Sequence, residues 1–234
     1  MLYYFYDWTY ILVVIGAMIC LAASARVNRV FARYSSVRSH SGMTGREAAE
    51  QILHRNGIYD VQVIHIPGNL TDHYNPGKKT LGLSDTVYNS SSVAAIGVAA
   101  HECGHAVQHA TGYAPLSIRG ALVPVANIGS MAAWPLIILG LFMNGQTSVM
   151  FINLGILLFS AAVLFQLVTL PVEFNASGRA VKVLENSGML YPEEVDSVKK
   201  VLGAAALTYV AGAAAMILQL LRLLILTGGR RRND

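Results

Sequence analysis

Four long apolar stretches set the pattern of the chain. Each holds enough nearly continuous apolar residues to cross a bilayer as a helix, which takes roughly 20 residues. They cover residues 8–25, 122–142, 149–170 and 204–227. We therefore expect about four transmembrane helices, of which the second and third form a hairpin.

The segment between the first two stretches is polar, and its pattern changes along its length. Thr44 and Glu47 have the spacing of a capping box, which predicts a helix that ends near Gly57. The patterns that follow predict a strand, a polar loop, a second short strand and a further helix, over 59–66, 72–79, 80–83 and 93–111. Helices beside a small sheet make the expected fold class α+β, mostly helical and integral to a membrane.

Composition agrees with the membrane assignment. Of the 234 residues, 54% are hydrophobic and 13% are charged, whereas soluble domains average about 25% charged. The net charge is +4, and basic residues flank the apolar stretches, which favours contact with anionic lipid headgroups. The chain lacks the interleaved aromatic and basic residues typical of nucleic-acid binding. We expect the lipid bilayer, and not nucleic acid, as a partner.

Charge and aromatic residues also predict an orientation. Arg26, Arg29 and Arg33 follow the first stretch, and positively charged loops stay on the cytoplasmic side. The N-terminus is then outside, and the polar segment is in the cytoplasm. The arginines at 230–232 would end up outside, so an interfacial or folded-back path for the last stretch stays open as the alternative. An interfacial aromatic anchor is predicted at Tyr3, Tyr4, Phe5, Tyr6, Trp8 and Tyr10.

The candidate chemistry lies in the helix predicted over 93–111. His101 and His105 are four residues apart and so share one helical face, where both imidazoles can hold one metal ion. Glu102 lies beside them as a candidate general base. Zinc fits such a site, because three protein ligands leave a fourth position for water. The alternative is a packed histidine pair on a buried helix.

A third ligand is needed from elsewhere in the chain. Glu173 follows the membrane hairpin, on the side of the membrane where the predicted orientation puts the two histidines. Pro171 predicts the start of a helix that runs to about Asn186. A zinc site of the His-His-Glu type needs a carboxylate such as that of Glu173, and a solvated glutamate in the first turn of this helix is the alternative. We also expect His73 or Tyr74, in the polar loop, to stabilise an oxyanion; local hydrogen bonding is the alternative.

Three strings of the chain can be compared with known families: Asp72-His-Tyr-Asn-Pro, Val98-Ala-Ala-His-Glu-Cys-Gly-His-Ala-Val-Gln-His and Pro171-Val-Glu-Phe-Asn-Ala-Ser. Together they resemble the YugP-type neutral zinc metallopeptidases of bacterial membranes. The resemblance covers nearly the whole chain, and it extends more distantly to the HtpX-like and prenyl-protein peptidases.

The resemblance implies a zincin-like, gluzincin-type unit that binds Zn²⁺. Its ligands are His101, His105 and Glu173, and Glu102 is its base. Asn175 and Ser177 are implied as residues that support the ligands, with Ser177 standing where the HtpX-like motif has an aspartate. The chain then divides into a membrane helix (1–25), a catalytic part (26–121), a membrane hairpin (122–170), a segment with the third ligand (171–203), a last membrane helix (204–227) and a basic tail (228–234).

Two functions of different kinds fit these features. The first is a multi-pass zinc metalloendopeptidase of the bacterial inner membrane, with its active site on the cytoplasmic face and with proteins or peptides, membrane proteins included, as substrates. The second is a catalytically idle zinc-binding scaffold that recruits a partner. A structural zinc site tends to close with a fourth protein ligand and has no use for a base, so Glu102 favours the enzyme. The sequence leaves the oligomeric state open.

Overall fold

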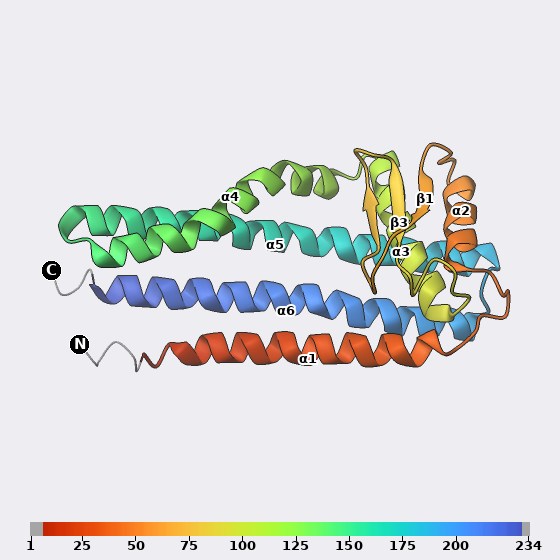
Figure 1. Ribbon diagram of the computed structural model, residues 1–234, viewed down its shortest axis with the longest axis horizontal. Coiled ribbons are helices and arrows are strands. Elements are labelled where there is room, and N and C mark those ends of the chain that lie inside the picture. Colours follow the sequence, from red (N-terminus) through yellow and green to blue (C-terminus); the bar gives the residue numbers. More distant parts are fainter. Residues whose placement is uncertain (1–6, 231–234) are drawn as a thin grey trace. The chain divides into compact units, whose positions relative to one another are not determined.

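The computed structural model describes residues 7–230 of the chain (Figure 1). Part of the predicted aromatic anchor (residues 3–6) and the end of the basic tail (231–234) lie outside these described residues. The described part is mostly helical with one small sheet, so the predicted fold class is confirmed. Its elements are α1 (Tyr10–Ser35), α2 (Gly45–Arg55), β1 (Gln62–His65), β2 (His73–Asn75), β3 (Thr80–Leu83), α3 (Val93–Ala110), α4 (Ala114–Phe142), α5 (Gly145–Ser187) and α6 (Pro192–Arg230).

Four of these helices are long and apolar enough to cross a membrane: α1, α4, α5 and α6. All four extend beyond the predicted apolar stretches. The prediction that a new helix begins at Pro171 is wrong, because α5 runs through this residue as one helix. Proline removes one backbone donor, but helix-forming sequence on both sides carries the helix across it. Two further prolines, Pro124 and Pro135, lie inside α4, and Figure 1 shows this helix bent.

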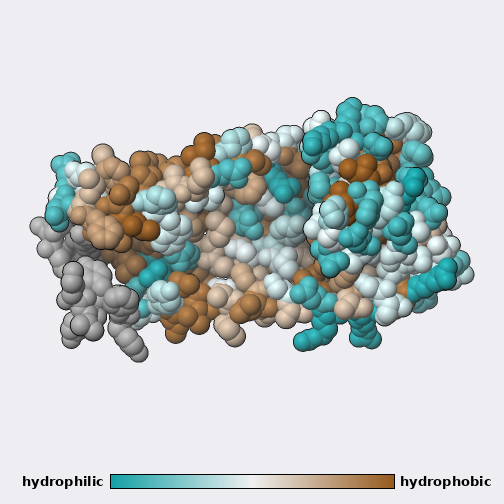
Figure 2. Space-filling model, in the orientation of Figure 1, coloured by the Kyte–Doolittle hydropathy of each residue, from teal (hydrophilic) through white to brown (hydrophobic). Residues whose placement is uncertain are grey.

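The chain forms two compact units. One, here called the membrane unit, contains Met1–Ala23, Ile118–Leu170 and Thr208–Asp234, and the other, the polar unit, contains Ser24–Ser117 and Pro171–Leu207. On the face drawn in Figure 2, hydrophobic residues are exposed over much of the membrane unit, whereas hydrophilic residues cover much of the polar unit. Exposed apolar side chains on long helices are what a lipid environment requires.

Glycines let α4 and α5 pack closely within the membrane unit. A Cβ atom at Gly129 would lie 2.6 Å from the carbonyl oxygen of Leu158, and one at Gly155 would lie 2.8 Å from that of Ala133. Small residues at helix contacts are typical of membrane proteins, because dispersion contacts between helices grow as the backbones approach.

The last apolar stretch does not fold back, since α6 is continuous to Arg230. Arg222 lies inside this stretch, and its charge is compensated within the membrane unit. Its Nη2 atom donates to Asp7 Oδ2 at 3.2 Å, and its guanidinium lies 4.9 Å from the ring centre of Tyr10. Pairing of this kind is how charged groups are accommodated at membrane depth.

The sheet of the polar unit has the strand order β1-β3-β2, with β1 parallel and β2 antiparallel to β3. The strand predicted over 80–83 is confirmed as β3. The first strand is shorter than predicted, and β2 lies where a polar loop was expected. Three residues are too few for an alternating pattern to show, and β2 exists because β3 supplies its backbone partners. An Asx turn follows, in which Lys78 N donates to Asn75 Oδ1.

Helix α3 lies in the core of the polar unit and occupies the predicted range almost to the residue. Its N-cap Ser92 accepts from Ala95 N at 3.1 Å, and Gly112, in the left-handed conformation (φ +62°), follows its end. The capping box of α2, formed by Thr44 and Glu47, is also confirmed.

Small residues along α3 let other helices come close. A Cβ atom at Gly104 would lie 2.5 Å from the carbonyl oxygen of Ala176 on α5, a distance that backbone cannot tolerate. At Gly97 an added Cβ would lie 3.0 Å from Val198 on α6. The contact at Gly104 sets how closely α5 approaches the histidine-bearing helix.

Gly104→Ala should therefore force α3 and α5 apart. We expect the free energy of unfolding of the metal-free protein to fall by about 1–3 kcal/mol, as in other overpacked cores, in a urea titration in detergent. Gly178→Ala on α5 is the control, because no atom lies within 4 Å of its added Cβ. This control should gain up to about 1 kcal/mol from helix propensity. Equal stability of the two variants would contradict the close contact.

Candidate metal centre

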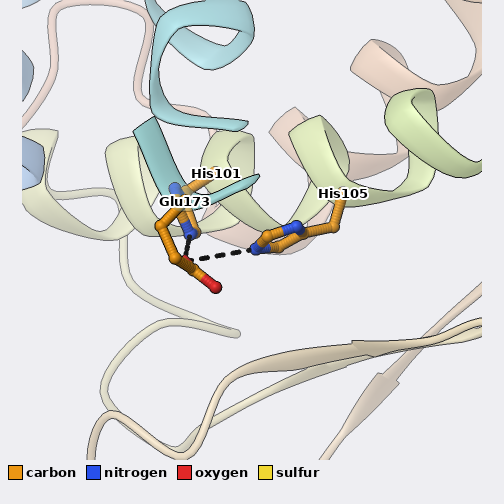
Figure 3. Close-up of side chains that lie close together, drawn as sticks. All are labelled: His101, His105 and Glu173. Carbon is orange, nitrogen blue, oxygen red and sulfur yellow. Dashed lines mark ion pairs between the residues drawn. The ribbon is translucent and has the colours of Figure 1, made fainter. Parts of the chain in front are cut away.

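Three side chains from two helices of the polar unit point toward one another (Figure 3). His101 and His105 come from successive turns of α3, and their ring planes are 87° apart. Glu173 comes from α5, and its Oε2 atom lies 3.3 Å from His101 Nε2 and 3.5 Å from His105 Nε2. The potential ligand atoms of the three residues all lie within 4.8 Å of one another.

This group fits a zinc ion by donor type and by spacing. Zinc is bound by imidazole and carboxylate ligands, as well as by thiolates, and its bonds to nitrogen and oxygen are about 2.0–2.2 Å long, which in a tetrahedron puts neighbouring ligand atoms about 3.3 Å apart. The carboxylate-to-imidazole distances of 3.3 and 3.5 Å agree with that spacing. Both histidines direct Nε2 inward, so the same type of nitrogen is offered by each.

The site is nearly closed to solvent. The side chain of Glu173 is 4% exposed, and those of His101 and His105 are 14% and 12% exposed. Burial acts to lower the pKa of His105, but hydrogen bonding and charge from Glu173, the charge of Glu102 and a hydrogen bond to Gln108 together raise it. A buried carboxylate beside two imidazoles thus attracts positive charge, which either protons or a metal ion can supply.

Both imidazoles are held by hydrogen bonds at Nδ1, the ring nitrogen that faces away from Glu173. His101 Nδ1 lies 3.0 Å from Ser177 Oγ, and His105 Nδ1 lies 3.0 Å from Gln108 Oε1. Of the two residues implied as supports, Ser177 therefore contacts a histidine directly, while Asn175 contacts Gln108 at 3.0 Å. Such partners fix which ring nitrogen faces the metal.

Gln108 was missed in the sequence although a signal exists. It lies three residues after His105, on the same helical face as the two histidines, and an amide on the buried face of an apolar helix needs partners. Its side chain is fully buried. Its Nε2 atom donates to the carbonyl oxygen of Val172 at 2.8 Å and to Asn175 Oδ1, both on α5.

The residues between the two histidines differ in their surroundings. Glu102 is 8% exposed, and its charge contributes to the raised pKa of His105. Cys103 is fully buried, and its Sγ donates to the carbonyl oxygen of Ala49 at 3.5 Å. Burial, followed by the charge of Glu102, raises the pKa of this thiol well above its usual value, so Cys103 is a neutral packed residue directed toward α2.

The structure separates the two candidates for oxyanion stabilisation. Tyr74 pairs with the buried Leu81 across β2 and β3, and its hydroxyl lies 3.1 Å from His109 Nδ1 on α3. His73 pairs with Gly82, and the two neighbours lie on opposite faces of the strand. The His73 ring is held in its own loop, with Nδ1 3.0 Å from the carbonyl oxygen of Thr71. Tyr74 thus faces the histidine-bearing helix, and His73 faces away from it.

Comparisons with known proteins agree with this chemistry. Residues 9–228 match the family described as "Putative neutral zinc metallopeptidase". The chain is also similar to "Putative membrane protease YugP" of Bacillus subtilis (strain 168), with 48% identity over 212 residues, which cover 90% of this chain and 93% of the relative. No solved structure matches the chain.

Zinc should stabilise the folded protein through this group. At a zinc concentration 1,000 times the dissociation constant, linkage adds about 4 kcal/mol to the free energy of unfolding, and a chelator should remove this gain. Glu173→Gln should abolish most of it, because the neutral amide is a poor zinc ligand.

The control is His109→Ala, one turn further along α3, which should keep the zinc-dependent gain. The measurement is thermal unfolding with and without zinc, together with the metal content of the purified protein. A gain that survives Glu173→Gln but is lost in His109→Ala would contradict the ligand set.

Proposed function

Because the chain belongs to the neutral zinc metallopeptidase family, we propose that it is a membrane-bound metalloendopeptidase. Its active site, in which peptide bonds of substrates are hydrolysed, is the metal centre formed by His101, His105 and Glu173. The observation that carries the proposal is the meeting of these three ligand side chains in a nearly closed site, with Glu102 next to a ligand in the sequence. When bound, zinc lowers the pKa of a water molecule and polarises a carbonyl group.

Two residues of the protein are assigned to proton transfer and to stabilisation of the oxyanion. Glu102 accepts a proton from the attacking water and passes it to the leaving amine, as a general base and then a general acid. Burial raises the pKa of Tyr74, with a further contribution from the charge of Asp60, so its hydroxyl stays a hydrogen-bond donor at neutral pH. From β2, Tyr74 donates to the oxyanion that forms on the substrate carbonyl.

The number of potential metal ligands supports an enzyme and not a structural zinc-binding scaffold. Among the described residues, the group at Glu173 contains three potential ligands, and catalytic zinc sites keep the fourth position for water. Cys103 is the nearest thiol in sequence, and it is directed to the carbonyl oxygen of Ala49. A structural site closed by four protein ligands has no support in this arrangement.

The proposed setting is the bacterial inner membrane. Four helices are long and apolar enough to cross a membrane, and the arginines after the first apolar stretch favour a cytoplasmic position for the polar unit. We propose proteins or peptides as substrates, including membrane proteins whose polar segments reach the site. Access from the cytoplasm requires no passage of a polar peptide through lipid.

The base is tested by Glu102→Gln. We expect the rate of cleavage of fluorescently labelled casein by detergent-purified protein to fall at least about 100-fold, because general base catalysis contributes that much or more. Zinc content should stay the same, since Glu102 is not a ligand. Glu193→Gln, in the exposed first turn of α6, is the matched control and should keep full activity. Undiminished activity of Glu102→Gln, or an inactive zinc-loaded parent, would favour the scaffold.

The role of Tyr74 is tested by kinetics. Tyr74→Phe keeps the packing of the ring but removes the donor, so kcat should fall by about 100-fold with little change in KM. His73→Ala serves as the control, because its ring lies on the other face of β2 and its loss should leave kcat unchanged. The assignment fails if Tyr74→Phe keeps the parental kcat.

A further inference from the structure

A chain of hydrogen bonds runs from His105 on α3 to Arg179 on α5. His105 Nδ1 lies 3.0 Å from Gln108 Oε1, and Gln108 Nε2 lies 3.0 Å from Asn175 Oδ1. Asn175 Oδ1 also accepts from Arg179 Nε at 2.8 Å. These hydrogen-bonded side chains connect α3 and α5, the two helices that carry the three candidate ligands.

The donors and acceptors of this chain can be assigned by chemistry alone. A guanidinium only donates, so the Asn175 atom that faces Arg179 must be the carbonyl oxygen. The Gln108 atom that faces this oxygen must then be the amide nitrogen. The same nitrogen also faces the carbonyl oxygen of Val172 at 2.8 Å, which requires a donor independently. The remaining atom, Gln108 Oε1, is therefore the one that faces His105.

An acceptor at that place fixes the tautomer of His105. Because Gln108 Oε1 can only accept, His105 Nδ1 must carry a hydrogen and donate. In the neutral imidazole this leaves the lone pair on Nε2, the nitrogen that lies 3.5 Å from Glu173 Oε2. His101 is held differently: its partner is the hydroxyl of Ser177, which can donate or accept and so fixes no tautomer.

We propose that Gln108 is a positioning residue that presents Nε2 of His105 to the metal, and that Asn175 and Arg179 keep its amide from turning over. The inference rests on the proposed use of His101, His105 and Glu173 as ligands. Gln108 is suited to this task because its side chain is fully buried and both amide hydrogens are used. Turning the amide over would bring nitrogen against His105 Nδ1 and oxygen against two acceptors.

The test is the dissociation constant for zinc, measured by competition with a chelator in the full-length protein. Gln108→Met has a similar shape, but its thioether sulfur is only a weak acceptor for His105 and no donor. We expect zinc binding to weaken about 10–100-fold, the range found for such supporting residues. Nitrogen-15 NMR of the zinc-loaded, histidine-labelled protein should show a signal from the Nδ1-bound hydrogen of His105 in the parent. In Gln108→Met this hydrogen should lose its protection from exchange with solvent. The midpoint of unfolding without metal reports separately on folding.

Variants at Asn175 test the hydrogen bonds furthest from the metal centre without changing a residue that contacts His105. Asn175→Leu removes the acceptor that orients Gln108 and should weaken zinc binding, whereas Asn175→Asp keeps an acceptor for both Gln108 and Arg179 and should not weaken it. Thr111→Val, at the C-cap of α3, is the control, because its hydroxyl bonds to the backbone carbonyls of Val107 and Gln108 and not to the Gln108 amide, and this variant should bind zinc like the parent.

The positioning role of Gln108 and the assignment of the three ligands are tested by different results. If Gln108→Met binds zinc as tightly as the parent, or if Asn175→Leu and Asn175→Asp behave alike, the positioning role is wrong. If Gln108→Met does not fold, the Asn175 pair decides alone. The ligand assignment is tested separately: it fails if His101→Ala and Glu173→Gln keep parental zinc affinity.

Discussion

The close approach of α3 and α5 is the constraint on which the site depends. Gly104 lies between the two histidines in sequence, and the absence of its side chain lets α3 rest against the backbone of Ala176. That contact brings Glu173 within 3.5 Å of both imidazoles. A nearly buried carboxylate between two imidazoles needs a compensating cation, so the packing of two helices and the binding of a metal are parts of one arrangement.

The same two helices also supply the support for the ligands. α5 contributes Glu173 itself, Ser177 behind His101 and Asn175 behind Gln108, while α3 contributes the histidines and Gln108. Residues at successive turns of one helix thus reach the site and its surroundings together. Since α5 continues through Pro171 as one helix, the third ligand lies on a helix and not on a loop.

Much of the fold could be predicted because local rules and burial agree. The serine N-cap and the glycine stop located α3, the capping box located α2, and apolar length located the four candidate membrane helices. The spacing of His101 and His105, with a carboxylate after the hairpin, predicted which side chains the structure brings together.

The features that were missed depend on partners distant in sequence. Strand β2 exists because β3 pairs with it, and the alternation between His73 and Tyr74 then decides which of the two faces α3. Gln108 has meaning only beside Val172 and Asn175, more than 60 residues away. A short polar segment shows no alternation, and the place of Gln108 on a buried helical face signals that its amide needs partners without showing which residues supply them.

The account is tested most directly by X-ray absorption at the zinc edge of the purified, zinc-loaded protein. It predicts nitrogen and oxygen neighbours only, at about 2.0–2.2 Å, with the outer-shell signature of two imidazoles. A sulfur neighbour at about 2.3 Å would contradict it, because the metal would then be held by a cysteine, and the arrangement of His101, His105 and Glu173 would not be the metal site.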